Sequence, residues 1–131
     1  MLPAIHSFHA HIYYDPASNR ATAAAVREAI AARFLVRLGR WHDLPVGPHP
    51  RAMFQVAFRP DVFAAFVPWL MLNRAGLTVL VHPNTGRPRD DHLVRALWMG
   101  ELLALEAATL PETESTDVME TEPNTAPRPD G

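Results

Sequence analysis

Stretches of strand-like alternation and helix-like periodicity follow one another along this chain in an order that few folds share. Alternating apolar and polar residues predict strands at residues 5–14, 52–58 and 77–82, with a short extended segment at 40–47. Apolar side chains at helical spacing predict helices at residues 21–39, 60–76 and 90–107. Gly39 and Gly76 supply the stop signals of the first two helices.

The resulting order is strand, helix, strand, strand, helix, strand and terminal helix. It predicts an α+β, ferredoxin-like split βαββαβ sheet followed by a C-terminal helix, with the helices on one face. The opposite face then has to be covered by a partner or used as a site, because a large apolar patch is unfavourable in water.

The chain of 131 residues is 48% hydrophobic, which is enough for one domain with a buried core. We place this domain at residues 1–108. Residues 109–131 are rich in Thr, Glu and Pro and hold six acidic side chains against one arginine, Arg128. Because so few large apolar side chains cannot offset the entropy lost on ordering, the sequence predicts a disordered acidic tail.

Composition excludes several classes of function. The chain has no cysteine, so disulfides and thiolate metal sites are excluded. Residues 1–108 hold 11 of the 12 arginines and 8 of the 14 acidic residues. This excess of positive charge is too small for a nucleic-acid-binding surface. The N-terminal residues lack a signal-peptide pattern, and no apolar run approaches the roughly 20 residues of a membrane span. We therefore expect a cytoplasmic protein that binds neither nucleic acid nor membrane.

The polar face of the first strand carries unusual residues. In FHAHIYYDP, residues 8–16, the apolar side chains alternate with His9, His11 and Tyr13. If the apolar set packs on the helices, these three side chains point to the open face. Their residue types are those of a binding or catalytic site rather than of a covered sheet.

Two further segments send histidines to the same face. His82 lies there at the end of the fourth-strand pattern, and His49 immediately precedes the third strand, in which Gln55 also faces the open side. Four histidines from three segments therefore converge on one surface. Neutral imidazole is the commonest metal ligand, and facial sets of two or three suit Fe(II), Zn(II) or Mn(II).

The residues alone leave other interpretations open. A single histidine on a strand is more often a hydrogen-bonded residue than a ligand. The same fold could carry a non-catalytic metal- or small-ligand-binding protein, or a metal-free dimer in which the open face forms only the interface. No carboxylate is evident that would complete a site of two histidines and one carboxylate, so a three-histidine site is equally compatible.

Four segments of the sequence resemble the DOPA 4,5-dioxygenase family. They are FHAHIYYDP, PVGPHPRAMFQVAF, VPWLMLNRAGLTVLVHPNTG and DDHLVRALWMG, in that order, and the resemblance extends from Ser7 to Leu105. It implies a ferredoxin-like, often dimeric protein with a non-haem metal that cleaves a catechol ring beside its two hydroxyls, which is extradiol cleavage. We therefore expect a homodimeric extradiol ring-cleaving dioxygenase that acts on O2 and on a catechol such as DOPA or a related compound.

The resemblance also implies a set of site residues, because the histidines of the family's motifs match those of this sequence. The matching positions are His9, His11, His49, His82, Asp91 and His92. Among them we predict His11, His49 and His82 as metal ligands. Non-haem Fe(II) is the expected ion, with Zn(II) or Mn(II) as alternatives.

The remaining site residues are assigned to proton transfer and substrate binding. We predict His9, His92 and Tyr13 as catalytic residues, since a histidine outside the ligand set can move protons near neutral pH. For His9, the roles of metal ligand and substrate contact also stay open. Arg51 follows the PHP motif and is predicted to pair with a substrate carboxylate, and Gln55 is predicted to contact the substrate.

Overall fold

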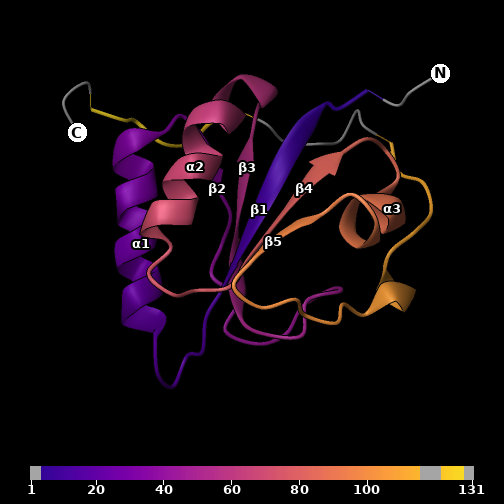
Figure 1. Cartoon of the computed structure of the whole chain (residues 1–131), viewed down its shortest axis with the longest axis horizontal. Coiled ribbons are helices and arrows are strands. Elements are labelled where there is room, and N and C mark those ends of the chain that lie inside the picture. The colour runs from indigo at the N-terminus through magenta and orange to yellow at the C-terminus, as the bar shows by residue number, and fades with distance from the viewer. Residues whose placement is uncertain (1–3, 116–121, 129–131) are drawn as a thin grey trace.

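Five strands form an antiparallel sheet in the order β2-β3-β1-β4-β5 in the structure, a computed structural model that describes residues 4–115 and 122–128 (Figure 1). The strands are β1 (Ser7–Tyr13), β2 (Arg37–Leu38), β3 (Met53–Phe58), β4 (Val79–Asn84) and β5 (Leu97–Met99). Because β3 lies between β1 and β2 and is antiparallel to both, the first part of the chain forms a split βαβ unit. The predicted α+β, ferredoxin-like sheet is confirmed, with β5 added at one edge.

Two helices cover one face of this sheet, as Figure 1 shows. They are α1 (Arg20–Arg33) and α2 (Phe63–Asn73), which follows a 3₁₀ turn at Pro60–Val62. From the helices, the core receives Ala23, Val26, Ile30, Phe66, Val67 and Leu70. From the strands it receives Ala10, Ile12, Phe54, Val56, Phe58, Val79 and Val81. These strand residues are the apolar positions of the alternating patterns, so the predicted assignment of the two sheet faces is confirmed.

The first helix is shorter than its sequence pattern predicts. It ends at Arg33 rather than at Gly39, and residues 37–38 of the expected helix form β2. After Phe34 the chain is extended, so Val36 is fully buried while Leu35 is 52% exposed. This segment therefore forms an edge strand in spite of its helix propensity, because β2 gains hydrogen bonds to β3 and the alternation of Leu35 and Val36 fits a strand.

The prediction of a terminal helix at residues 90–107 is wrong over most of that range. Helix α3 spans only Pro88–Leu93, and β5 then pairs with the free edge of β4, from Val81 opposite Leu97 to Val79 opposite Met99. Gly100 ends the strand with a φ of 86°, in the left-handed region that glycine adopts most readily. The hydrogen bonds offered by an unpaired strand edge explain why a helical pattern is overridden here.

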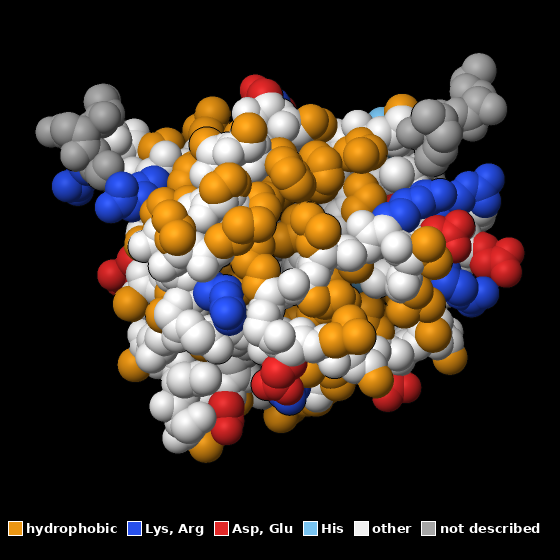
Figure 2. Space-filling model, in the orientation of Figure 1, with side chains coloured by type: hydrophobic (Ala, Val, Ile, Leu, Met, Phe, Trp, Pro, Cys, Tyr) orange, Lys and Arg blue, Asp and Glu red, His pale blue; other side chains and the backbone are white. Residues whose placement is uncertain are grey.

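The second face of the sheet is covered by the chain itself. Tyr13, Met53 and Leu80 are buried there, and the segment after α3 packs on them through Trp98 and Leu103. An open apolar face, which the sequence predicted and from which we expected a dimer, is therefore not present. Exposed hydrophobic side chains gather instead on the face that carries α2 and β5 (Figure 2).

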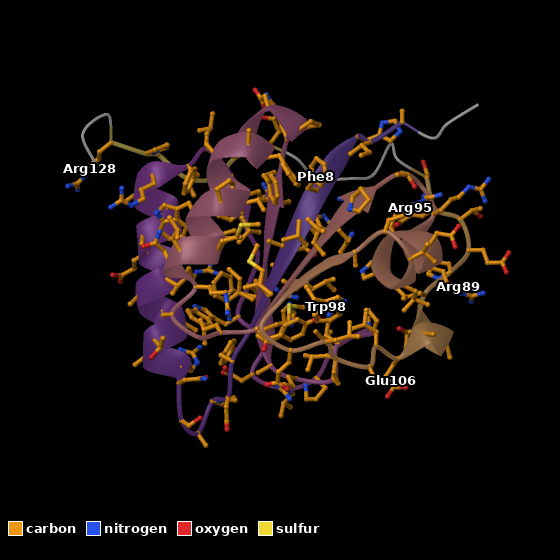
Figure 3. The ribbon with its side chains drawn as sticks, in the orientation of Figure 1. Phe8, Arg89, Arg95, Trp98, Glu106 and Arg128 are labelled. Atoms are coloured by element: carbon orange, nitrogen blue, oxygen red, sulfur yellow. The ribbon has the colours of Figure 1, made fainter. Side chains whose placement is uncertain are left out.

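The described parts of the C-terminal tail contact the body of the protein. Asn124 lies beside the edge strand β2, where its side chain accepts a hydrogen bond from the Leu38 N–H at 2.7 Å and donates one to the Leu38 carbonyl at 2.9 Å. The Arg128 N–H donates to the carbonyl of Ala32 in α1, and Figure 3 shows Arg128 beside that helix. These contacts differ from the disordered tail expected from composition, because the unpaired backbone of β2 supplies partners that composition does not reveal.

Residues 116–121 and 129–131 of the predicted tail lie outside the described residues, and the domain boundary at residue 108 stays a prediction. No helix in the described part of the chain is both long enough and apolar enough to span a bilayer.

Candidate metal centre

Five histidines from four segments meet on the sheet face opposite α1 and α2. His9 and His11 lie two residues apart on β1, so their side chains point the same way. His82 of β4 is directly opposite His9 in the register. His49 reaches the cluster from the loop before β3, and His92 reaches it from α3. The sheet therefore brings together all the histidines that the sequence analysis assigned to a site.

Two sets of three ring nitrogens in this histidine cluster are each close enough to hold one ion. The Nε2 atoms of His11 and His82 are 3.0 Å apart. Two triads have one ligand atom from each member within 4.8 Å of the others: His9, His11 and His82, and His11, His49 and His92. His11 belongs to both triads, whereas the predicted ligands His49 and His82 fall in different ones.

Backbone hydrogen bonds fix which nitrogen of two histidines faces the cluster. The Nδ1–H of His82 donates to the Pro83 carbonyl at 2.8 Å, and the Nδ1–H of His92 donates to the Pro88 carbonyl at 2.7 Å. A neutral imidazole has one N–H, so the Nε2 atom of each ring carries a lone pair. This arrangement, with one ring nitrogen bonded to a carbonyl and the other free, is the usual one for metal-binding histidines.

Burial keeps the cluster uncharged near neutral pH. Desolvation lowers the pKa of His49 to about 3 and, with a smaller contribution from His92, lowers the pKa of His9 to about 4. The pKa values of His11 and His82 are also held well below the ordinary value, first by burial and then by neighbouring histidines. The rings are therefore in the form that binds a metal, without competition from protons.

Tyr13 joins this cluster through His49. The phenol oxygen of Tyr13 lies 2.7 Å from Nδ1 of His49, and both side chains are buried. Burial raises the pKa of Tyr13 above its ordinary value, so the group stays a phenol. If His49 Nδ1–H donates to the phenol oxygen, the Nε2 atom of His49 also presents a lone pair.

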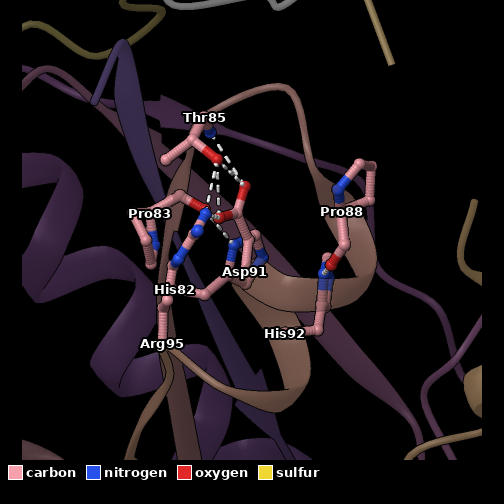
Figure 4. A network of polar contacts seen from close by, with 7 residues as sticks. All are labelled: His82, Pro83, Thr85, Pro88, Asp91, His92 and Arg95. Carbon is pink, nitrogen blue, oxygen red and sulfur yellow. Dashed lines mark hydrogen bonds and ion pairs between the residues drawn. The ribbon is translucent and has the colours of Figure 1, made fainter. Parts of the chain in front are cut away.

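A buried carboxylate holds the helix that carries His92. Asp91 accepts hydrogen bonds from the backbone N–H of Thr85 at 2.8 Å and from its hydroxyl at 2.9 Å, and it pairs with Arg95 at 3.0 Å (Figure 4). The network ties α3 to the end of β4, next to His82. Because its oxygens are engaged in this way, Asp91 acts here as a positioning residue for His92 and not as a free carboxylate facing the histidines.

A cavity of about 270 Å³ opens onto the cluster. His9, His11, His49, His92 and the predicted contact residue Gln55 line it. Three tail residues also line it, namely Leu110, Pro111 and Glu114. The place of these three residues in the cavity could not be predicted from the sequence, because nothing in their local composition links them to histidines elsewhere in the chain.

Arg51 is not brought to the histidine cluster. Its guanidinium forms a two-pronged ion pair with Glu101, at 3.2 and 3.0 Å. Arg51 and Glu101 line a separate cavity of about 430 Å³, which also reaches Tyr13. Its predicted pairing with a substrate carboxylate would therefore require this ion pair to open.

Comparison with protein families gives one match that spans most of the domain. Residues 8–109 match the model of the Dopa 4,5-dioxygenase family. This range contains every histidine of the cluster and ends just before the tail residues that line the cavity.

Individual relatives agree with this match. An uncharacterised 21.2 kDa protein of Botryotinia fuckeliana is 45% identical over 112 residues, covering 76% of this chain and 61% of that protein. A DOPA 4,5-dioxygenase of Amanita muscaria is 33% identical over 115 residues, covering 82% of this chain and 50% of that enzyme. The chain thus spans between half and two thirds of the length of these two relatives.

A solved structure is also similar. A crystal structure of a protein from Nostoc punctiforme, provisionally described as a dioxygenase, superimposes with a TM-score of 0.78 and shares 57% sequence identity. The similarity covers 80% of this chain and 90% of that chain.

Proposed function

This chain belongs to the Dopa 4,5-dioxygenase family, and we propose that it is a metal-dependent dioxygenase that opens a catechol ring by extradiol cleavage with O2. DOPA and related catechols are the proposed substrates. The observation that carries the proposal is the cluster of five histidines beside a cavity, in which His11, His49 and His82 are buried and the Nε2 atoms of His11 and His82 are 3.0 Å apart.

The residues present fit a metal ion. Two nitrogens that bind one ion at right angles, each at about 2.1 Å, lie about 3.0 Å apart. The Nε2 atoms of His11 and His82 have this separation, at 3.0 Å. Both rings are buried, and burial lowers the pKa of each well below its ordinary value, so protons do not compete with an ion for these nitrogens.

We propose His9, His11 and His82 as the residues that hold the ion. All three lie on β1 and β4, two adjacent strands in the middle of the sheet. This set differs from the one predicted from the sequence, in which His49 stood in place of His9. Non-haem Fe(II) is the ion that suits three such ligands and O2 chemistry.

The bound ion would supply two things: it would orient the catechol and O2 together, and it would lower the pKa of the catechol hydroxyls. His92 has an unprotonated Nε2 at the cavity and can accept a proton that the catechol releases. The Tyr13 phenol holds the His49 ring in place beside the cavity through their 2.7 Å hydrogen bond. Cleavage breaks the ring C–C bond beside the two hydroxyls, and both atoms of O2 enter the product, so no other reductant is required.

We also propose a homodimer, formed through the apolar face that carries α2 and β5. Leu72 is 86% exposed on α2 and Leu97 is 49% exposed on β5, an edge strand whose outer backbone groups face no other strand of the described sheet. A second copy can pair with this edge and cover these side chains. Light scattering at micromolar concentration should give twice the chain mass, and Leu97→Glu should give the chain mass. A monomeric wild-type protein would contradict the dimer.

Ring cleavage is tested by anaerobic loading with Fe(II), addition of a panel of catechols and then admission of O2. Consumption of one O2 per catechol, with a new visible absorbance from the ring-opened product, is expected for at least one catechol. Metal binding without O2 consumption on any catechol would indicate instead a non-catalytic metal- or ligand-binding protein.

A further inference from the structure

A short part of the C-terminal tail forms one wall of the histidine cavity. Leu110, Pro111 and Glu114 line this cavity together with the histidines, although they lie well beyond α3 in the sequence. Leu110 is only 5% exposed. We call residues 110–114 the wall segment.

Several contacts hold the wall segment in place. The backbone N–H of Arg89 donates to the Pro111 carbonyl at 3.2 Å, and its guanidinium donates to the Leu110 carbonyl at 2.9 Å and pairs with Glu112 at 3.2 Å. At the other end, the Glu114 N–H donates to the Gly86 carbonyl at 2.8 Å. Arg89 lies on α3, on the side of the molecule where the tail passes (Figure 3). Both ends of the segment are therefore anchored to the loop and helix that follow β4.

Two carboxylates, Asp91 and Glu114, are among the described residues that line this cavity. The histidines are kept neutral by burial, and the other carboxylate that lines the cavity, Asp91, is engaged by Thr85 and Arg95. No arginine is among the described residues that line it. A ligand in the cavity therefore meets one carboxylate that is not already neutralised by an arginine.

We propose that Glu114 makes the site prefer catechols whose side arm carries only an ammonium group over catechols whose side arm carries only a carboxylate. This inference rests on the proposed function. Glu114 would attract the cationic arm and repel the anionic one while the ring occupies the histidine end of the cavity. The effect should be modest, because Glu114 is exposed and pairs between exposed charges are weak.

The test compares an amine and an acid of similar size, 3,4-dihydroxyphenethylamine and 3-(3,4-dihydroxyphenyl)propionate. The ratio of their kcat/KM values is measured for the Fe(II)-loaded wild type, Glu114→Gln and Glu106→Gln. Glu106→Gln is the control, because it removes one exposed negative charge that neither lines the cavity nor belongs to the wall segment. Anaerobic dissociation constants for both compounds are measured in parallel.

The ratio of amine to acid should fall about five-fold in Glu114→Gln at low salt, and less at high salt, where screening already weakens the attraction. It should stay near the wild-type value in Glu106→Gln. An unchanged ratio in Glu114→Gln, or an equal fall in the control, would overturn the inference. If the wild type cleaves neither compound, the proposed function fails for them, and the ratio of the anaerobic dissociation constants decides the role of Glu114 separately by the same criterion.

Discussion

His11 and His82 lie on the two adjacent central strands β1 and β4, and their Nε2 atoms are 3.0 Å apart in the buried centre of the histidine cluster. Such an approach of two neutral imidazoles is compatible with one proton between them or with one ion bound by both. The hydrogen bond from His82 Nδ1–H to Pro83 gives the His82 ring a fixed orientation in either case.

Replacing either member of this pair should abolish tight metal binding. Loss of a partner that only supports a ligand typically weakens metal affinity 10- to 100-fold, and His11→Ala or His82→Ala should cost at least that much. Metal content after dialysis against a weak chelator is the measurement. His42→Ala is the control, because His42 joins β3 through its backbone and lies outside the cluster. Full metal content in both cluster variants would exclude the pair as ligands.

The hydroxyl of Tyr13 should matter for turnover rather than for metal binding. Tyr13→Phe removes the partner of the buried His49 Nδ1, which should lower the free energy of unfolding by about 1–3 kcal/mol. It should also reduce kcat while the metal content stays unchanged. The adjacent Tyr14 bonds to Asp43 on the other side of the strand, so Tyr14→Phe is the control and should retain kcat. Equal kcat values in the two variants would refute a catalytic role for Tyr13.

The tail should be divisible into a part that the site needs and a part that it does not. A chain ending at Ser115 keeps the wall segment, whereas one ending at Ala108 loses it. Burial of one leucine side chain, here Leu110, contributes roughly 2 kcal/mol. The free energy of unfolding of the shorter chain should therefore be lower by about that amount. Denaturant unfolding and ring-cleavage rates of the two chains are compared. If the tail is disordered, as its composition predicts, truncation after Ala108 should leave stability and rate nearly unchanged, and equal values for the two chains would support that interpretation.

A side chain at Gly100, in the turn after β5, should lower the free energy of unfolding. Gly100 has a φ of 86°, and a Cβ there would lie 3.0 Å from Nη1 of Arg74 and 3.3 Å from Oγ1 of Thr78. Gly47 also has a positive φ but has no atom within 4 Å of such a Cβ. The left-handed conformation costs an L-residue about 1–2 kcal/mol at either position. Gly100→Ala should lose roughly 1 kcal/mol more than Gly47→Ala in denaturant unfolding, since close contacts are added to the backbone strain. Equal losses would show that the contacts relax freely.

The sheet could be predicted from the sequence because its strands carry strict alternation. His9 and His11 were assigned to the correct face of β1 for this reason. The limits of α1 and the identity of β5 could not be predicted, since both depend on the hydrogen bonds of a strand edge that is created only when the sheet forms. A stretch such as LWM fits a helix and a strand equally well until that edge is present.

Most members of the histidine cluster could also be predicted, but which histidines lie opposite one another on β1 and β4 could not. The sequence placed His11 and His82 on one face, yet it could not give the register that sets His82 opposite His9. Glu114 was assigned to a tail without structure, because its place in the cavity depends on Arg89 and Gly86, which are distant in sequence. Arg51 was assigned to the site from its neighbour His49, although its side chain turns to Glu101.

The location of the metal is the most direct test of this account. Crystals soaked anaerobically in Fe(II) should give an anomalous difference peak at the iron edge within about 2.3 Å of Nε2 of both His11 and His82. The same peak should be missing from crystals of His11→Ala grown and soaked identically. Iron located elsewhere on the chain would contradict the claim that the histidine cluster is the metal centre. The absence of a peak would also contradict it if the soaked protein consumes O2 with a catechol.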